Sequence, residues 1–450
     1  MNTDTIIKYN NYKKKTDSVC FFASYSYGNK VQEYVFYYLA DLMKNNFDIV
    51  FISSSPLQET DVERLKQFSP LIIEKPNIGL DFSSWHLGLK ELKFGKKYSS
   101  VLLANDSVFG PLYSLEDIIS TAKKSDFDMF GMTDSLEINY HLQSYFLYFK
   151  SSIITSSTWL SFWNNFKLTD NKQQIIQEYE IGLSQLMLKN NFKLGAFSSY
   201  NVLAQDLNIT VNCNQSLAFY KELINRYKFP FYKRELLIKE GISNVFAHLG
   251  IVIDTRSWKH TIESHTTYPV NLIEDFESYY FNFMKNSALN SQKKIPPKIL
   301  FISHNASLSG APVGFLNFIR WFKHNTNYAF EIIIRDTSHG GDKLLNEFES
   351  LAKTSVYCNS SMHVLDELRH RLLKENVQLI LSNTLVNFDV EQYLSVLNCT
   401  QICYVHELEY VIQAWTGLSK NLKWIEKRNS YIIACSEAVK SNLVLLSSKT

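Results

Sequence analysis

The sequence predicts an α/β protein built from two successive units, each organised around a parallel sheet. Short apolar runs rich in β-branched residues alternate with segments of helical period through roughly the first 130 residues, which is typical of strands joined by crossover helices. The same order restarts after Pro296 and Pro297, which precede a fresh apolar run. We therefore expect a first unit over residues 1–290, a linker over 291–297 and a second unit over 298–450.

The first unit is expected to open with a regular alternation of strands and helices. Its strands are expected at Val19–Ala23, Asp48–Ser53, Leu71–Glu74, Ser99–Ala104 and Phe127–Met132. Its helices are expected at Val31–Lys44, Glu59–Gln67 and Ser83–Leu92. In the first of these helices the apolar residues recur at helical spacing, which places them on one buried face.

Beyond these elements the alternation loosens. Tyr140–Phe149 is rich in alternating aromatic residues and is expected to form one long strand. Helices are expected at Ser156–Phe166 and Gln173–Leu188, and an aromatic, basic stretch follows at Lys228–Arg234.

The second unit is expected to repeat the opening pattern. Its strands are expected at Ile299–Ser303, Phe330–Arg335, Val377–Ser382, Gln401–Val405 and Tyr431–Ala434. A glycine-containing turn at Ser309–Pro312 is expected to lead into a helix at Val313–Phe322. By pattern alone, each unit is of the nucleotide-binding α/β kind.

Composition narrows the possible functions. The 450 residues carry 46 Lys and Arg against 44 Asp and Glu, a net charge of +2, so they lack the one-sided basic field of a nucleic-acid-binding protein. No apolar run approaches the roughly 20 residues of a membrane helix, no signal peptide is visible, and the six cysteines are scattered like buried free thiols. We expect a cytoplasmic protein. Lys13–Lys15 is either a solvated tail or a weak contact with anionic lipid that would place the protein peripherally at a membrane.

Polar residues follow the predicted strands of the first unit. They are Ser24–Tyr25 after the first strand, Asn77, Gly79 and Asp81 after the third, and Asn105–Asp106–Ser107 after the fourth. Ligands of open α/β sheets bind beyond the carboxyl ends of the strands. A carboxylate in this position could hold a divalent cation that neutralises a diphosphate, although Asn-Asp-Ser is also ordinary turn chemistry.

Five stretches in a fixed order carry a family resemblance. They are Glu74–Trp85, Leu102–Pro111, Met129–Thr133, His141–Phe146 and Pro230–Glu235. Together they resemble the rhamnan synthesis protein F family, proteins of polysaccharide assembly, over roughly residues 15–290. The resemblance implies a GT-A-like glycosyltransferase domain, with a nucleotide-binding α/β sheet, a metal-binding DxD motif and an acidic base.

On this resemblance Asp106 stands for the last acid of DxD and would bind Mg²⁺ or Mn²⁺, while Ala104 replaces the first acid. Ser24, Tyr25, Asn77, Gly79, Asp81, Asn105 and Ser107 would line the nucleotide-sugar pocket. Glu180 falls at the position of the base that deprotonates the acceptor at a helix N-terminus. Glu178 and Glu180 could instead only complement a helix dipole.

Four further residues have the same two alternatives, a role in ligand binding or a structural role. His141 and Gln143 could hydrogen-bond a sugar or form a satisfied buried polar row. Lys233 and Arg234 could clamp a diphosphate or lipid-linked phosphate, or carry solvated surface charge.

The second unit resembles the N-terminal, Rossmann-like half of a GT-B glycosyltransferase of the family-four kind. Lys298–Leu316 matches the opening strand and glycine loop, and Tyr404–Glu407 and Ala434–Glu437 match later strand ends. The donor-binding half of such enzymes would follow residue 450, so we expect an incomplete domain. Gly310, His406 and Glu407 are predicted to contact the acceptor.

The sequence therefore predicts a glycosyltransferase. We expect it to move a deoxyhexose, L-rhamnose by resemblance, from a nucleotide-diphosphate donor such as dTDP-L-rhamnose. The acceptor would be an oligosaccharide or lipid-linked glycan of a cell-surface polysaccharide or O-antigen, and the reaction inverting. The alternative is a non-catalytic glycan-assembly scaffold built from degenerate transferase domains. An epimerase is disfavoured because no GxGxxG follows a predicted strand.

Overall fold

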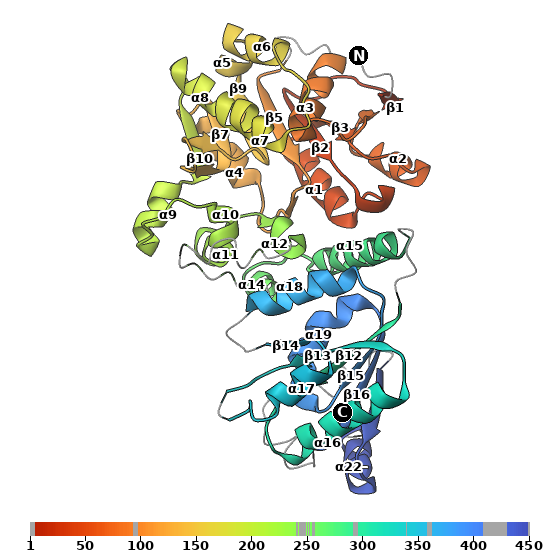
Figure 1. Ribbon diagram of the computed structural model, residues 1–450. Helices are drawn as coiled ribbons and strands as arrows, with labels where there is room; N and C mark the ends of the chain where they lie inside the picture. Colours follow the sequence, from red (N-terminus) through yellow and green to blue (C-terminus); the bar gives the residue numbers. More distant parts are fainter. Residues whose placement is uncertain are drawn as a thin grey trace. The chain divides into compact units, whose positions relative to one another are not determined.

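The computed structural model describes residues 5–92, 98–239, 242, 249, 251, 253, 257–290, 296–338, 340–357, 362–407 and 430–448. Contacts within the chain divide it into Met1–Glu277 and Ser278–Thr450, which are described in turn (Figure 1). Helix α15 (Asn271–Asn290) carries the chain across this division. Residues 291–295 of the predicted linker lie outside the described residues, and the predicted boundaries stay a prediction.

The first unit holds a nine-stranded sheet. Eight of its strands are ordered β1 (Ile6–Asn10), β4 (Leu71–Glu74), β3 (Phe47–Ser53), β2 (Ser18–Ser24), β5 (Ser100–Asn105), β9 (Phe146–Lys150), β7 (Met129–Ser135) and β10 (Leu194–Ser198), and the ninth, β8 (His141–Leu142), pairs with β7. Strands β4, β3, β2 and β5 are mutually parallel, which confirms the predicted α/β class. Strands β1 and β9 run antiparallel to their neighbours; β1 was not predicted, and β9 overlaps the end of the predicted strand Tyr140–Phe149.

Helices cover both faces of this sheet because its central strands are apolar on both faces. On one face, Tyr38 of α1 (Glu33–Lys44) packs edge-on against Phe22 of β2, with ring centroids 5.3 Å apart. On the other, α3 (Leu80–Glu91) lies so close to β2 that a Cβ on Gly88 would stand 2.7 Å from the ring of Phe21. The predicted helices around β2 are confirmed, and α3 starts earlier than expected.

The remaining helices of the first unit pack around the sheet or follow it. They are α2 (Glu59–Leu65), α4 (Glu116–Lys124), α5 (Ser151–Ile154), α6 (Ser157–Asn164), α7 (Lys172–Ile175), a π-helical segment η2 (Ile176–Ile181), α8 (Gly182–Lys189), α9 (Tyr200–Leu207), α10 (Gln215–Ala218), α11 (Tyr220–Tyr227), α12 (Glu235–Ile238) and α14 (Trp258–His265). The predicted helix Gln173–Leu188 is thus one continuous helical run with a π-helical middle.

The prediction of a single strand over Tyr140–Phe149 is wrong. The segment is divided into β8 and β9 by a turn around Ser144. The reason lies in polar side chains on either side of this turn. Both Gln143 and Tyr145 bond to the Thr133 hydroxyl of β7, at 2.7 and 2.8 Å, and interrupt the strand there, while β8 and β9 on either side both pair with β7.

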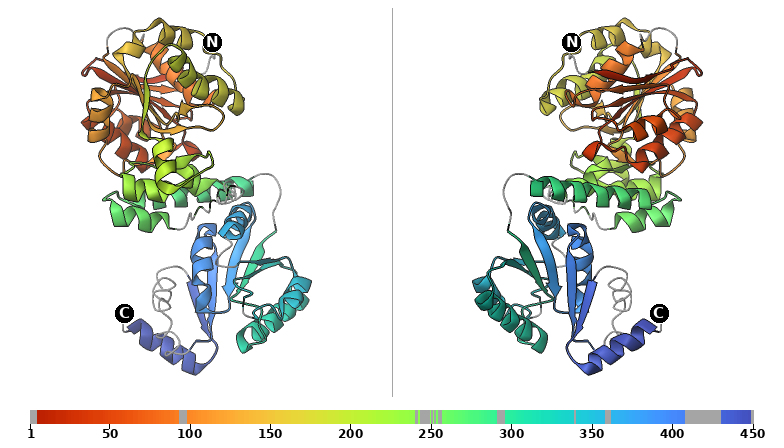
Figure 2. Two further views of the ribbon diagram at one scale, coloured as in Figure 1. Left: turned by 90° about the vertical axis from the view of Figure 1, so that its left-hand side faces the viewer. Right: turned by 90° about the vertical axis from the view of Figure 1, so that its right-hand side faces the viewer.

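The second unit contains a six-stranded parallel sheet. The strand order is β14 (Thr354–Val356), β13 (Ala329–Ile334), β12 (Lys298–Ser303), β15 (Val377–Ser382), β16 (Thr400–Val405) and β17 (Ser430–Ala434). All five strands predicted here are confirmed, and β14 was missed. Helices α16 (Gly310–Asn325) and α17 (Leu345–Leu351) share one apolar core with β12 and β13 and lie on one side of the sheet (Figure 2).

Three more α-helices of this unit lie in the described part of the chain. They are α18 (Met362–Leu373), α19 (Phe388–Tyr393) and α22 (Glu437–Ser448). The predicted turn at Ser309–Pro312 is wrong beyond its first residue, because α16 begins at Gly310 and Pro312 stands in its first turn, where proline costs no hydrogen bond.

Two expectations drawn from composition can be compared with the described residues. No helix among them is long and apolar enough to cross a membrane. Five of the six cysteines are described, all as free thiols, and the sixth, Cys358, lies outside the described residues.

Candidate functional site

Asp106 lies at the carboxyl end of the first sheet, just beyond β5, and it is held by donors from several elements. Its Oδ2 accepts hydrogen bonds from the Ser24 hydroxyl (2.8 Å) and the Tyr25 backbone N–H (2.9 Å), both at the end of β2. Its Oδ1 lies 3.4 Å from Nη1 of Arg234. Burial raises the pKa of Asp106, and Arg234 and the hydrogen bonds oppose that rise. The carboxylate side chain is only 6% exposed, so this is a buried ion pair.

Arg234 reaches Asp106 because two short strands pair far from each other in sequence. Strand β11 (Tyr232–Lys233) runs antiparallel to β6 (Val108–Phe109), and the Arg234 backbone N–H then donates to the Ser107 carbonyl at 2.9 Å. Arg234 Nη1 also donates to the Tyr34 hydroxyl (2.8 Å), and that hydroxyl donates to the Asp106 carbonyl (3.0 Å). The predicted basic motif and the predicted acidic motif therefore meet.

Asp81 stands in the first turn of α3, beside the same strand ends. Its Oδ2 accepts a 2.7 Å hydrogen bond from the Asn105 side-chain amide, and Asn105 Oδ1 accepts from the Ser107 hydroxyl at 2.7 Å. Burial and the nearby negative charge of Asp106 raise the pKa of Asp81 to about 6, against the influence of Asn105, Arg234 and Lys75. A carboxylate held at this pKa in a cluster of charges is typical of a functional site.

Lys233 adds a second cation to this edge. Its ammonium lies 3.5 Å from the ring centroid of Tyr145 and has no hydrogen-bond partner among the described residues. Burial lowers the pKa of Lys233 to about 8, and Glu180, Glu235 and Asp81 act against that. The negative charges of Asp81 and Glu180 thus both favour the charged form of Lys233.

Glu180 lies in the π-helical segment η2, in the interior of the helical run. The prediction that it stands at a helix N-terminus is wrong, and so is the dipole interpretation that depended on it. Its Oε1 accepts from the backbone N–H (2.9 Å) and the hydroxyl (3.0 Å) of Ser144, the residue of the turn before β9. Its Oε2 has no hydrogen-bond partner in the described part of the chain. π-helical segments often accompany functional sites.

Other predicted site residues make hydrogen bonds or packing contacts within the protein. The Gln143 side chain accepts from Thr133 (2.7 Å) and Ser216 (3.2 Å), and His141 Nδ1 bonds to the Asn139 carbonyl at 2.8 Å. Both are buried, as in the alternative of a satisfied polar row. Gly79 has φ +78°, and a Cβ there would meet Leu168 at 2.6 Å, so the close approach is to a protein side chain. Asn77 is exposed nearby.

The donor set at Asp106 does not fit the predicted Mg²⁺ or Mn²⁺. A cation of this kind needs oxygen lone pairs at short range. The oxygens of Asp106 already face a hydroxyl, an N–H and a guanidinium, and the position of the first DxD acid is Ala104, which is fully buried. No group of three His, Cys, Asp or Glu suited to a metal occurs among the described residues.

Sequence reasoning missed two residues of this site. Tyr34 projects from α1 and links Arg234 to the Asp106 backbone, yet in sequence it is one of many aromatic residues on a helix. Lys75 follows β4, is 7% exposed, and donates to the Pro76 (2.8 Å) and Ile78 (3.0 Å) carbonyls. Burial lowers the pKa of Lys75 to about 8. A lysine directly after an apolar strand, among the other polar strand ends, was the available signal.

The second unit has its own polar edge. Glu407 Oε2 accepts from the His406 backbone N–H (3.0 Å), and its Oε1 accepts from the Leu385 N–H (3.2 Å) and the Thr384 hydroxyl. His406 Nε2 is buried without a hydrogen-bond partner among the described residues. Gly310 opens α16, with nothing within 4 Å of a Cβ placed on it. The acceptor role of these three residues stays a prediction.

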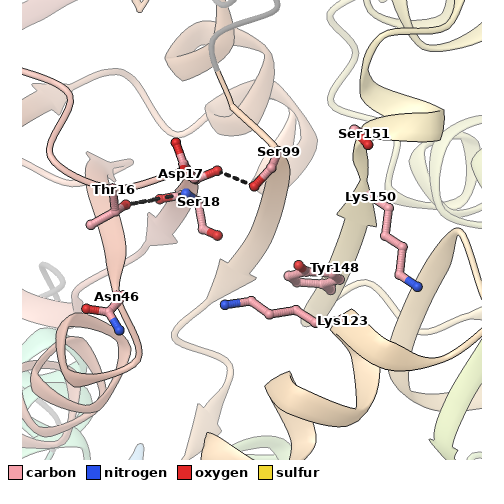
Figure 3. A pocket seen from close by; sticks show the side chains of 9 residues that line it. All are labelled: Thr16, Asp17, Ser18, Asn46, Ser99, Lys123, Tyr148, Lys150 and Ser151. Atoms are coloured by element: carbon pink, nitrogen blue, oxygen red, sulfur yellow. Dashed lines mark hydrogen bonds between the residues drawn. The ribbon is translucent and has the colours of Figure 1, made fainter.

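A pocket of about 400 Å³ lies at the opposite, amino end of β2 and β5. Its nine lining residues include Lys123, Tyr148 and Lys150, with Asp17 and Ser99 facing them across the opening (Figure 3). The Ser99 hydroxyl donates to the Asp17 carbonyl at 2.8 Å. None of the predicted site residues lines this pocket. Ligands of parallel sheets bind at the carboxyl ends, so we place the candidate site at Asp106.

Part of the chain is similar to a known protein family and to individual proteins. The family described as rhamnan synthesis protein F matches residues 49–305. The uncharacterized protein y4gN of Sinorhizobium fredii is 30% identical over 179 residues, which are 39% of this chain and 45% of that protein. The chain thus covers less than half of that relative. The virulence protein VirA of Vibrio anguillarum is 24% identical over 271 residues, 52% of this chain and 84% of its own length.

Two solved structures are also similar. One is Anabaena Alr3699/HepE in complex with UDP-glucose, at 16% identity and TM-score 0.26, covering 33% of this chain and 40% of its own. The other is the apo-form glycosyltransferase GlyE of Streptococcus pneumoniae, at 11% identity and TM-score 0.31, covering 96% and 99%. Both TM-scores are too low to assign a shared fold. The family match, in contrast, spans more than half of the 450 residues and includes Asp81, Asp106 and the basic motif Lys233–Arg234. The chain belongs to the rhamnan synthesis protein F family.

Proposed function

We propose that the chain is a glycosyltransferase of polysaccharide synthesis that uses a nucleotide-diphosphate sugar. One observation carries the proposal. Ser24 at the end of β2, Asp106 just beyond β5 and Asp81 in the first turn of α3 lie at the carboxyl edge of one sheet with a basic pair, Lys233 and Arg234. Two cations of this kind suit the two negatively charged phosphates of a donor, because lysine and arginine both recognise phosphate.

The proposed chemistry assigns a part to each group. Lys233 and Arg234 bind the diphosphate and stabilise the charge that grows on it as the bond to the sugar breaks. Glu180, whose Oε2 has no partner among the described residues, accepts the proton of the acceptor hydroxyl that attacks the sugar. Attack from the face opposite the leaving diphosphate gives an inverting reaction. L-rhamnose is the first sugar to test, with an oligosaccharide or lipid-linked glycan of a cell-surface polysaccharide or O-antigen as acceptor.

The experiment is a donor screen followed by a variant comparison. The intact chain is heated with dTDP-L-rhamnose, UDP-glucose and other nucleotide sugars, since any ligand that prefers the folded state raises the melting temperature. Lys233→Met should abolish the stabilisation, whereas Lys239→Met, which changes an exposed lysine directly after α12, should leave it unchanged. Stabilisation by no donor would favour the non-catalytic scaffold.

Transfer itself is tested with the donor that binds. Glu180→Gln keeps the size of the side chain and the acceptor atom for Ser144 but cannot take a proton. It should retain donor binding and lower transfer by about 10²–10⁴-fold, the usual contribution of a general base. Full transfer activity in this variant would remove Glu180 from the mechanism.

A further inference from the structure

We infer that Arg234 takes the place of a divalent cation at Asp106, so that the site binds its nucleoside diphosphate without a metal ion. The inference rests on the proposed function and adds its cofactor requirement. The observation behind it is that hydrogen-bond donors and the Arg234 guanidinium already contact both oxygens of Asp106. Asp106 is the residue at which the family resemblance implied Mg²⁺ or Mn²⁺.

Both carboxylate oxygens of Asp106 already have partners within the protein. Oδ2 accepts two hydrogen bonds, from Ser24 and from the Tyr25 N–H, and Oδ1 faces the guanidinium at 3.4 Å. A metal ion here would have to displace these donors. It would also stand next to a permanent positive charge in a place where the two side chains are 6% and 12% exposed, and like charges repel strongly away from water.

Arg234 is fixed by contacts within the protein. Its backbone N–H is held by the Ser107 carbonyl at 2.9 Å, and its Nη1 by the Tyr34 hydroxyl at 2.8 Å. The guanidinium carbon lies 5.6 Å from the ring centroid of Tyr27 and 5.9 Å from that of Phe276. A cation is thus fixed in one geometry by hydrogen bonds and aromatic faces, as a metal would be by its ligands.

Lys233 and Arg234 still have hydrogen-bond donors available for a ligand. A guanidinium has five N–H donors, and Nε and Nη2 of Arg234 have no hydrogen-bond partner among the described residues. The Lys233 ammonium likewise has none there. Asp106 therefore neutralises and orients one cation, and donors from both basic residues remain for the oxygens of a diphosphate.

The test measures nucleotide binding with and without metal. The intact chain is treated with a chelator, and binding of UDP, dTDP and GDP is measured by calorimetry in chelator and then in excess Mg²⁺ or Mn²⁺. We expect the nucleotide that binds to have the same affinity, within about twofold, in all three buffers. Binding that requires Mg²⁺ or Mn²⁺ would overturn the inference and leave the proposed function standing. Binding in none of the buffers would overturn both.

Two variants test whether Arg234 binds the nucleotide or only supports the fold. Tyr34→Phe keeps the guanidinium but removes its hydroxyl partner, and should weaken binding in chelator by about 3- to 10-fold. Arg234→Met should weaken it by about 10- to 100-fold, and its fold is checked by circular dichroism. The matched control is Arg226→Met, which changes an exposed arginine of α11 that pairs with Asp206. This control should bind like the parent. If Tyr34→Phe and Arg234→Met also bind like the parent, Arg234 does not replace a metal.

Discussion

Replacing Asp81 by asparagine should stabilise the first unit near neutral pH. Burial and the neighbouring Asp106 raise the pKa of Asp81 from 3.8 to about 6. Between about pH 4 and 6 the folded state holds a proton that the unfolded chain has already lost, so the free energy of unfolding falls as pH rises through this window. A difference of about 2 pKa units corresponds to roughly 3 kcal/mol, and partial solvent access reduces this to about 1–3 kcal/mol.

The substitution preserves the local structure. The side-chain oxygen of asparagine can still accept the hydrogen bond from Asn105, while the buried negative charge is gone. The measurement is urea unfolding of the parent and of Asp81→Asn, from about pH 4 to neutral pH, followed by the fluorescence of the first unit. Asp117→Asn, on the exposed side of α4, is the control and should follow the parent. A variant that is less stable than the parent at neutral pH, or that shows the same loss between pH 4 and 6, would refute the reasoning.

Two further substitutions, one in each unit, test which residues stabilise that unit. Gly79→Ala should cost about 1–3 kcal/mol of unfolding free energy, because φ is +78° and the new Cβ would stand 2.6 Å from Leu168; urea unfolding measures it, and an unchanged value would show that the loop adjusts. Arg371→Leu should cost the second unit about 3–5 kcal/mol, because Glu331 is 1% exposed and, among the described residues, would keep only Lys298, at 3.4 Å, as its ion-pair partner. Lys440→Leu, which changes an exposed partner of Glu437, is the control and should change stability by less than about 1 kcal/mol; thermal unfolding of the parent and both variants measures the two effects.

The sequence predicted the central strands and the polar residues at their ends because both follow local rules. An apolar run such as Val19–Ala23 forms a strand buried on both faces, and residues that follow parallel strands meet at one edge. The sequence alone therefore predicts that Ser24, Asn105 and Asp106 are neighbours.

The parts that could not be predicted depend on pairings between distant segments. The contact of Arg234 with Asp106 requires the short strands β6 and β11 to pair, and neither is long enough to have a pattern of its own. Likewise, the division of Tyr140–Phe149 depends on the Thr133 hydroxyl of another strand. The π-helical segment at Glu180 has the same apolar spacing as an ordinary helix, so periodicity does not reveal it.

One inverted strand widens what this sheet can do. Strand β9 runs against β5, with Phe146 opposite Ala104, so the chain enters β9 at the edge where β5 leaves the sheet. Ser144, just before that entry, is thereby carried to the same edge and fastens Glu180 to it through two hydrogen bonds. A sheet with only parallel strands offers ligands the residues that come after its strands. Reversing a single strand also recruits residues that come before one, and with them a carboxylate from a helix that no strand of the sheet leads into directly.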